Sequence, residues 1–512
     1  MHSIPYLIRL FGLAIRFRRY GALRALASIE MVPPGLVWLL RLLTFYIPHK
    51  FGLPKNPGER LAAAFAAMGP SYIKLGQTLA TRPDVVGADL ARGLTTLQDR
   101  LPAFNFALAK TAIEDELGGK LEDFFSQIDE TPIAAASIAQ VHKATTCDGE
   151  LVAVKVLRPG IKRRFAADMA LFTWIAEKAE RHSKKAKRLR PMAVVKTLAN
   201  SVAREMDLRL EASAASELSE NMQGFEGYRI PAIYWSYTSE RILTSEWVSG
   251  IKLTDIKAVE SAGHDMSRLA HTIVQAFLTQ AMYHGFFHAD LHQGNLLIEE
   301  DGTLVAVDFG IMGRLSIKER RFLAEILHSF IVRDYIRVAE VHFDAGYVPK
   351  DQSLADFAQA LRAIAEPILD LPIEKMSAGA LLTQLFSTTE RFAMQTQPQL
   401  IMLQRSMVMA EGLALHLDPS ANMFEVSRPV LESWARDNLS PEILFADALR
   451  EIPSLLTRLP AALERFLEEK PETTTVTPEK RTFWQAVLPG LGLAFVIIFA
   501  FASLEGLLPY AS

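Results

Sequence analysis

Two short apolar runs around a turn constrain this chain most, because they bring three oxygen-bearing side chains to one end of an expected hairpin. The runs are residues 296–298 and 304–307, and the Glu-Asp-Gly sequence between them favours a tight turn. Asn295 stands directly before the first run, and Asp308 stands directly after the second. Asp290 lies five residues before Asn295. The sequence therefore predicts a cluster of two carboxylates and an amide.

The spacing of these three side chains matches the catalytic set of protein kinases, in which the second carboxylate opens an Asp-Phe-Gly sequence. In that set the first aspartate orients or deprotonates the attacking group, while the asparagine and the second aspartate hold Mg²⁺ on the nucleotide phosphates. Lys155 ends an alternating run, Val-Ala-Val-Lys, like the kinase lysine that contacts the α- and β-phosphates. These matches predict catalysis by Asp290 and Mg²⁺ ligation by Asn295 and Asp308. They also predict that Lys155 binds ATP.

A lysine over phosphates needs a carboxylate to hold it in place, and a helix expected over residues 194–220 offers three. At 100° per residue, Asp207 and Glu211 share one face of that helix, while Glu205 points elsewhere. We predict that Glu211 pairs with Lys155 and belongs to the ATP site. Glu205 or Asp207 is then left for a different partner.

The stretch that corresponds to the kinase glycine-rich loop contains no glycine. Its sequence over residues 134–142 is Ala-Ala-Ala-Ser-Ile-Ala-Gln-Val-His, and an alanine Cβ restricts positive φ and close approach of the backbone to phosphates. We expect a stiffer loop that holds the nucleotide differently, with ATP-binding positions at Ala134, Ala135, Ala136 and Ser137. Glu246 and Val248 follow a strand-like run and are expected to present backbone groups to the adenine.

The segment after the Asp-Phe-Gly sequence is too short for the peptide-docking loop of a protein kinase. Residues 311–315 lead directly to Ser316 and Glu319, whose S-x-x-E spacing starts a helix, so protein phosphorylation is not expected. Along the chain, helices precede a small strand-rich block and a large helical block. This order predicts an α+β, protein-kinase-like two-lobe fold with a helical N-terminal extension and a C-terminal transmembrane helix.

The two ends of the chain suggest contact with a membrane. Residues 484–504 contain no Asp, Glu, Lys or Arg and are long enough to cross a hydrocarbon core of about 30 Å as a helix. Lys480 and Arg481 precede this stretch and no positive charge follows it, which places the catalytic body in the cytoplasm by the positive-inside rule. Residues 4–26 are basic and apolar without an acid. They suit either anionic lipid headgroups or a helix packed on the domain with its arginines in water.

Composition sets further limits. A net charge of −3 gives no reason to expect a nucleic-acid partner, and the single cysteine, Cys147, excludes an intramolecular disulfide. The expected organisation is a basic amphipathic segment (1–55), a helical extension (56–130), a kinase-like N-lobe (131–250), a helical C-lobe (251–470), a linker (471–483) and a transmembrane helix (484–504) of a single-pass protein in a bacterial-type inner membrane.

Five motifs together resemble the UbiB family, the aarF-domain-containing or ADCK-like atypical kinases of ubiquinone biosynthesis. They are K-x-G-Q at 74–77, A-A-A-S at 134–137, E-x-D at 205–207, H-A-D-L-H-Q-G-N at 288–295 and D-F-G at 308–310. The resemblance implies ATP (or ADP) with Mg²⁺, and an ATPase or small-molecule kinase that supports ubiquinone production. It implies membrane lipids, quinone-biosynthesis enzymes or prenylated phenols as partners. Two terminal spans are typical of the bacterial family members, whereas we expect one here.

The resemblance also assigns a regulatory role to the helix around residues 74–77. It implies that Lys74 and Gln77 fold over the cleft where a peptide would lie, with Lys74 on the Glu205 and Asp207 acids. Two alternatives to the ATPase remain open: a prenylphenol or lipid kinase, and a nucleotide-binding scaffold for quinone-biosynthesis enzymes.

Overall fold

The computed structural model describes residues 4–438, except for residues 28, 30–33, 81, 98–100, 183–186, 188–189, 370–391, 393, 395–396 and 422. All of these residues belong to one unit, Met1–Leu439. The predicted linker (471–483) and transmembrane helix (484–504) lie outside the described residues. Within the described part, no helix has the length and apolar character needed to cross a membrane.

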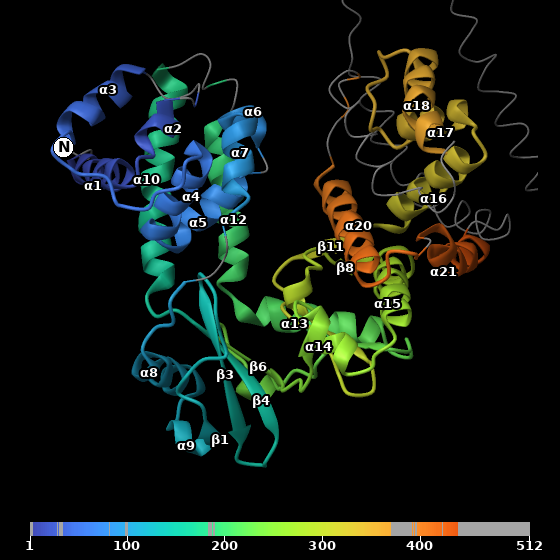
Figure 1. Cartoon of the computed structure of the whole chain (residues 1–512), viewed down its shortest axis with the longest axis horizontal. Helices are drawn as coiled ribbons and strands as arrows, with labels where there is room; N and C mark the ends of the chain where they lie inside the picture. The colour runs from blue at the N-terminus through green and yellow to red at the C-terminus, as the bar shows by residue number, and fades with distance from the viewer. Residues whose placement is uncertain are drawn as a thin grey trace, which may run out of the picture. The chain divides into compact units, whose positions relative to one another are not determined.

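The N-terminal extension is helical, and it packs on two helices of the next block (Figure 1). Its helices are α1 (Ile4–Arg19), α2 (Leu23–Ala27), α3 (Pro34–Leu43), α4 (Pro57–Met68), α5 (Pro70–Ala80), α6 (Pro83–Val86) and α7 (Ala88–Leu94). Gly69 ends α4 with φ 103°, and Pro70 begins α5. Phe65 and Ile73 share a buried cluster with Phe165 and Leu198 of α10 and α12, so the extension is fixed by a common core.

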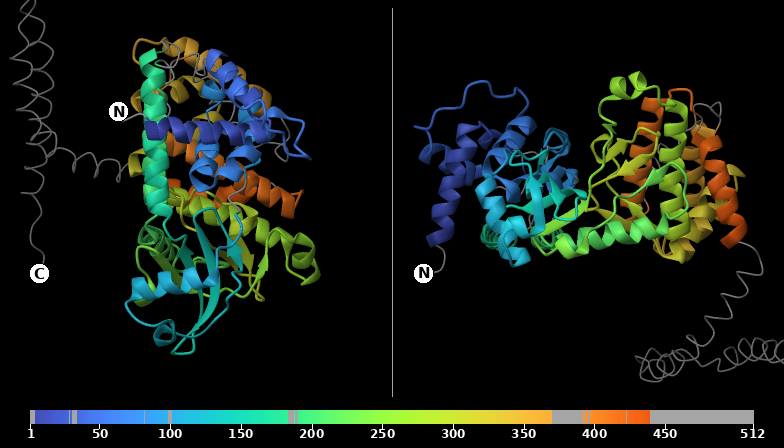
Figure 2. Two further views of the ribbon diagram at one scale, coloured as in Figure 1. Left: turned by 90° about the vertical axis from the view of Figure 1, so that its left-hand side faces the viewer. Right: turned by 90° about the horizontal axis from the view of Figure 1, so that it is seen from below.

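The N-lobe is a five-stranded antiparallel sheet with the order β1-β3-β4-β6 and β2 paired to β3. The strands are β1 (Phe125–Ile128), β2 (Ala134–Ala135), β3 (Ala139–Thr146), β4 (Leu151–Leu157) and β6 (Ile242–Glu246). The helices of this part are α8 (Phe106–Leu117), α9 (Leu121–Phe124), α10 (Ile161–His182), α12 (Pro191–Glu205), α13 (Leu208–Asn221) and the short η1 (Trp235–Tyr237). In Figure 2, α1 crosses α10, where Tyr6 stacks on Trp174 at 5.5 Å between ring centroids.

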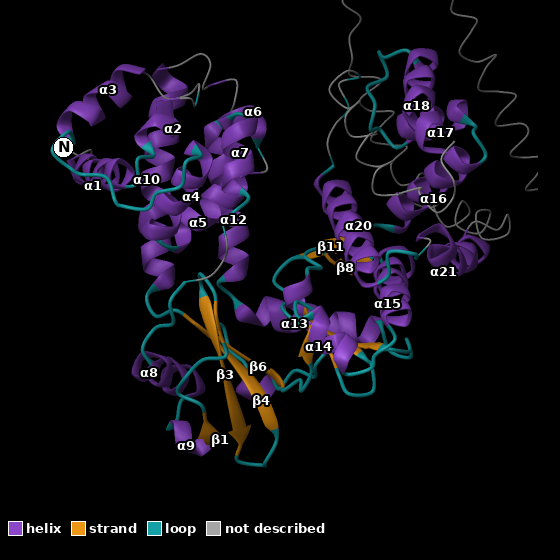
Figure 3. Ribbon diagram, viewed as in Figure 1, coloured by secondary structure: helices purple, strands orange, loops and turns teal. Residues whose placement is uncertain are grey.

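The C-lobe is mainly helical, and its strands lie near the hairpin (Figure 3). A four-stranded sheet has the order β5-β10-β9-β7 and a two-stranded sheet joins β8 to β11. These strands are β5 (Tyr228–Arg229), β7 (Ile251–Lys252), β8 (Phe286–His288), β9 (Leu296–Ile298), β10 (Leu304–Ala306) and β11 (Met312–Arg314). The helices are α14 (Ile256–Ser261), α15 (Met266–Leu278), η2 (Thr279–His284), η3 (Gln293–Asn295), α16 (Ile317–Ile331), α17 (Tyr335–Asp344), α18 (Leu354–Leu369), α20 (Pro398–Leu417) and α21 (Met423–Asn438).

Two boundaries differ from the expected organisation. The sheet of the N-lobe begins at Phe125, inside the expected extension, after Gly118 ends α8 in a left-handed conformation with φ 75° and the short α9 follows. Tyr228–Arg229 falls inside the expected N-lobe, but it pairs in parallel with β10 of the C-lobe. The kinase-like α+β class itself is confirmed, and the helix start at Ser316 has the predicted capping box with Glu319.

His342 gives the helical part of the C-lobe a pH dependence. Its ring is 2% exposed and donates from Nδ1 to the Val338 carbonyl at 2.7 Å. Burial lowers the pKa of His342 from 6.5 to about 4. Between these values the unfolded chain binds a proton that the folded chain excludes, so stability falls as the pH falls. We expect the free energy of unfolding to lose about 2 kcal/mol between pH 7 and pH 5 from this group.

Urea unfolding of the His342→Leu variant at pH 7 and pH 5 measures this loss of unfolding free energy. The variant should lose most of that pH dependence even if it is less stable overall. The matched control, His328→Leu, removes an exposed histidine of α16 and should keep the wild-type dependence. Equal pH dependence in all three proteins would contradict the assignment.

Candidate functional site

The hairpin of the site has the predicted form. Strands β9 and β10 pair antiparallel, with Ala306 opposite Leu296, and the Val307 N–H donates to the Asn295 carbonyl at 2.9 Å. Asn295 and Asp308 therefore flank the same end of the hairpin, as the apolar runs predict. Both side chains line a cavity of about 380 Å³.

The predicted pair of Lys155 and Glu211 is present, and it includes Asp308. Lys155 Nζ donates to the two Glu211 oxygens at 2.7 and 2.9 Å, and it lies 3.4 Å from Asp308 Oδ1. The side chains of Lys155 and Glu211 are 17% and 10% exposed. Strand β4 supplies the lysine and the first turns of α13 supply the glutamate. A cation is thus fixed between two carboxylates at the cavity wall.

Electrostatic interactions keep Lys155 and Asp308 charged. The Lys155 ammonium lowers the pKa of Asp308 to about 2. Burial by itself would lower the pKa of Lys155, but the Asp308 and Glu211 carboxylates raise it above its usual value. Asp308 is also one of the few non-glycine residues with positive φ, at 66°. That conformation costs of order 1 kcal/mol.

Asp290 is held through its backbone from both sides. Asn295 Nδ2 donates to the Asp290 carbonyl at 3.1 Å, and the Asp290 N–H donates to Nδ1 of His288 at 3.2 Å. Burial lowers the pKa of His288, so its ring is neutral and can accept this bond. The amide nitrogen of Asn295 is thereby occupied, which leaves its Oδ1 as the group that can face a metal ion.

The cavity beside these residues is lined by four of the six other predicted ATP-binding residues, Ala134, Ala136, Glu246 and Val248. It is lined by Ile133, Ala134, Ala136, Ala139, Val141, Ala153, Lys155, Glu211, Pro231, Ile233, Leu243, Ser245, Glu246, Trp247, Val248, Gly250, Lys252, Gly294, Asn295, Leu297, Val307, Asp308 and Phe309. Ala135 and Ser137 of the predicted set are not among them, and Ser137 is fully buried.

The backbone at the predicted adenine-facing segment is partly occupied. The N–H groups of Glu246 and Trp247 donate to the carbonyls of Ala232 and Leu151 at 2.8 and 3.0 Å. The Glu246 side chain pairs with Arg229 at 2.9 Å. These two N–H groups are therefore not available to a base, and Val248, the other predicted position, also lines the cavity.

The Lys74 contact follows the resemblance only in part. Lys74 Nζ lies 2.7 Å from Glu205 Oε2, with both side chains largely buried. Asp207 instead caps α13 by accepting from the Arg209 N–H, and it pairs with the Arg209 guanidinium. Gln77 is half-buried on α5, and within the described part of the chain its side chain makes no contact with Glu205 or Asp207.

The expected single helix over residues 194–220 is wrong. Helix α12 ends at Glu205 and α13 starts at Leu208, because Asp207 takes an extended conformation as the N-cap. Two carboxylate directions do result, as predicted. They come from this break in the chain, not from two faces of one helix.

Arg405 is the site residue that sequence reasoning missed. It lies on α20, where it is the only Lys or Arg, and its Nη2 is 3.5 Å from Asp290 Oδ1. The other Asp290 oxygen lies 3.9 Å from Nε2 of His292. The signal in the sequence was a lone arginine in a 20-residue helix rich in Leu and Met. Nothing in the local pattern connects it with a residue 115 positions away.

The fold and the site define an atypical kinase. The ABC1 atypical kinase-like domain matches residues 96–342, and the UbiB helical domain matches residues 361–422. A solved structure titled as the Rv3197–erythromycin complex from Mycobacterium tuberculosis aligns with TM-score 0.50 at 23% identity, covering 72% of this chain and 94% of that chain. This likeness concerns the fold.

Two curated relatives extend over almost the whole chain. A probable protein kinase UbiB of Pseudomonas putida (strain GB-1) is 37% identical over 506 residues, which are 96% of this chain and 92% of the relative. A probable protein kinase UbiB of Azotobacter vinelandii is 37% identical over 474 residues, 90% and 87% of the two chains. The chain belongs to the UbiB family of atypical kinases, as the five motifs predict. It is an enzyme of ATP-dependent phosphoryl transfer.

Proposed function

We propose that this protein binds ATP with Mg²⁺ and hydrolyses it, or transfers its γ-phosphoryl group to a small molecule, in support of ubiquinone biosynthesis. The observation that carries the proposal is Lys155, which bridges Glu211 and Asp308 on the wall of the cavity. A buried cation beside a carboxylate that stays ionised is what a metal–polyphosphate complex requires.

The donor groups fit Mg²⁺ that arrives with a nucleotide. Asp308 offers a carboxylate that is ionised above about pH 2, and Asn295 offers an amide oxygen. No group of three or more His, Cys, Asp or Glu in the described residues could form a metal cage. Mg²⁺ commonly takes one or two protein oxygens and completes its shell with phosphates and water. Mg²⁺ held by Asn295 and Asp308 would neutralise phosphate charge, and Lys155 would support the α- and β-phosphates.

Asp290 would orient the attacking group. It does not line the cavity that we assign to the nucleotide, and its side chain is 27% exposed. A water molecule or a small hydroxyl can therefore approach it from outside that cavity. The stretch from Phe309 to Ser316 holds β11, which pairs with β8, and leaves little chain for a peptide platform. We therefore favour water or a small molecule over a protein as acceptor.

Product analysis tests this function. The full chain in detergent is incubated with ATP and Mg²⁺, with and without vesicles and a prenylated phenol, and all products are identified. We expect ADP and free phosphate, without phosphoprotein. A phosphorylated phenol or lipid would replace the ATPase with the small-molecule kinase. Absence of any nucleotide turnover in every mixture would favour the scaffold.

Arg405 gives a second, finer test of the site. Its contact with one Asp290 oxygen should fix the carboxylate, and so Arg405→Ala should lower kcat by about tenfold. Arg405→Lys should restore part of the loss because it keeps the charge. The matched control is Arg428→Ala on α21, an exposed arginine, which should leave kcat unchanged. Wild-type turnover in Arg405→Ala would show that Arg405 does not position Asp290.

We also propose that membrane lipids contact the N-terminal helices. Exposed large apolar side chains concentrate on α1, on α3 and on the stretch after α3: Leu7, Ile8, Phe11, Trp38, Leu39, Leu42, Leu43, Phe45, Tyr46 and Phe51. Part of α1 does pack on the domain, since Arg9 donates to the Ala167 carbonyl at 2.6 Å. Packing on the domain and contact with lipid are therefore both supported for the basic segment. One side of it packs on the domain, and another side is apolar and exposed.

Vesicle binding by a chain ending at Lys480 separates this surface from the predicted transmembrane helix at residues 484–504. We expect weaker attachment than for the full chain, and a further loss when Trp38, Leu39 and Leu42 are replaced by serine. Serine at Leu108, Leu210 and Ile336, which are about equally exposed, is the matched control. If the truncated chain stays wholly membrane-bound, the N-terminal surface is the main anchor.

A further inference from the structure

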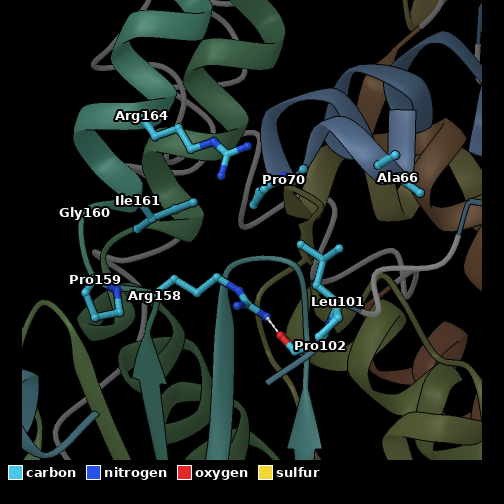
Figure 4. A pocket seen from close by; sticks show the side chains of 11 residues that line it. Ala66, Pro70, Leu101, Pro102, Arg158, Pro159, Gly160, Ile161 and Arg164 are labelled. Atoms are coloured by element: carbon cyan, nitrogen blue, oxygen red, sulfur yellow. Dashed lines mark hydrogen bonds between the residues drawn. The ribbon is translucent and has the colours of Figure 1, made fainter. Parts of the chain in front are cut away.

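A second cavity, of about 400 Å³, lies where the N-terminal extension meets the N-lobe (Figure 4). Its walls come from the end of α4, the start of α5, residues 101–102 and the connection from β4 to α10. Arg158 and Arg164 are its charged lining residues, and none of the lining residues is acidic. In Figure 4 both side chains extend from the β4–α10 side towards the extension. The cavity is distinct from the one beside Asp308, with which it shares no lining residue.

The two guanidinium groups retain unused hydrogen-bond donors. Arg158 Nε donates to the Ser137 carbonyl at 3.0 Å, and its Nη2 donates to the carbonyls of Pro102 and Ala136 at 2.7 and 3.0 Å. Arg164 Nη2 donates to the Met68 carbonyl at 2.7 Å. Within the described part of the chain, no carboxylate pairs with either arginine, and the Nη1 groups have no acceptor. Burial and the nearby Arg164 charge both lower the pKa of Arg158.

The Arg158 and Arg164 guanidinium groups repel each other at this cavity. The first turn of α10 carries Lys162, Arg163 and Arg164 and no acid, although cations are unfavourable at a helix N-terminus. Gly69, at φ 103°, leaves the space that Arg164 occupies, since a Cβ at this position would lie 2.6 Å from Arg164 Nη2. An anion between the arginines would relieve the repulsion.

We propose that this cavity binds the phosphate group of a small organic phosphate. Two arginine guanidinium groups match the geometry and charge of a phosphate. Ala66, Leu101 and Ile161 supply apolar wall, which suits an attached carbon group better than a bare ion. The volume of about 400 Å³ leaves room for both parts.

A phosphate bound in this cavity should also affect the alanine-rich loop, because Arg158 contacts both. This guanidinium holds the carbonyls of Ala136 and Ser137 on one side and lines the cavity on the other. An anion on its free Nη1 would fix the side chain and, with it, the loop over the nucleotide cavity. This coupling rests on the proposed function, whereas the binding of the phosphate does not.

Calorimetric titration of the full chain in detergent with phenyl phosphate tests the site. We expect saturable binding to one site that Arg164→Gln weakens by about tenfold or more. Arg163→Gln removes the same charge from the adjacent exposed position of α10 and should weaken binding by less than about twofold. Lys155→Met, which alters the other cavity, should leave binding unchanged.

Three results would overturn the site: no binding of any probe, equal weakening by Arg163→Gln and Arg164→Gln, or loss of binding in Lys155→Met. Vesicles that contain phosphatidic acid form a separate arm of the experiment. Vesicle binding that depends on Arg164, without binding of phenyl phosphate, would assign the phosphate to a lipid headgroup.

The coupling is measured as the ADP affinity with and without saturating phenyl phosphate. We expect about threefold tighter ADP binding, and the same factor for phenyl phosphate when ADP is saturating. Equal ADP affinities in both conditions would overturn the coupling. A protein that binds phenyl phosphate but no nucleotide would keep the site and count against the proposed function, so the two failures are distinguishable.

Discussion

Replacing Asp308 with asparagine should lower ATP turnover by about 10³-fold and weaken the Mg²⁺-dependent binding of nucleotide. The carboxylate lies on the wall of the cavity, 3.4 Å from Lys155, and its pKa of about 2 keeps it ionised at any working pH. A neutral amide would bind the metal less well and would not balance the lysine. Steady-state turnover and ADP titrations with and without Mg²⁺ measure the two effects.

The fold should survive this substitution because Lys155 retains Glu211 as its partner. Glu300→Gln removes a carboxylate from an exposed position of the same hairpin and should behave as wild type. Normal ATP turnover in Asp308→Asn would show that Asp308 is not a metal ligand. If quinone synthesis in cells persisted while turnover was abolished, the protein would act as a scaffold.

Replacing Asp290 with asparagine should lower kcat by about 10²–10⁴-fold and leave ADP affinity unchanged. Asp290 does not line the nucleotide cavity, and its carboxylate lies between Arg405 and His292 at 3.5 and 3.9 Å. It can therefore act on the attacking group without contributing to nucleotide binding. This separation of kcat from affinity distinguishes Asp290 from Asp308, where both should change.

The control for this variant is Asp344→Asn, at the exposed end of α17, which should change neither quantity. Loss of ADP binding in Asp290→Asn would show that the nucleotide reaches beyond the cavity. An unchanged kcat would mean that a different group orients the acceptor.

Local patterns predict the hairpin and the strand of the lysine well, because neighbouring residues decide them. The run from Leu151 to Leu157 alternates, and β4 has these bounds. The end of α8 was harder to place. An apolar periodicity continues past Gly118, but the left-handed conformation of that residue ends the helix and lets β1 join the sheet.

The sequence predicts the partners of some charged residues and misses those of others. Glu211 is predictable because a lysine on a buried strand needs a carboxylate from a neighbouring helix, here α13. Helical periodicity places Asp207 on the face of Glu211, and the resemblance pairs Asp207 with Lys74, but the structure makes Asp207 the N-cap of α13. Arg405 had no local signal of a role, because α20 approaches the Asp290 loop only through the packing of the C-lobe.

The sequence by itself determined the chemical groups of this protein and their local frame. The order of Asp290, Asn295 and Asp308 around one hairpin is a property of short-range strand pairing, which needs little loop-closure entropy. Only the tertiary structure decided which distant groups meet them. Lys155 reaches Asp308 across 153 residues and Arg405 reaches Asp290 across 115. Such contacts depend on the burial of whole helices in shared cores, which no short stretch of sequence encodes.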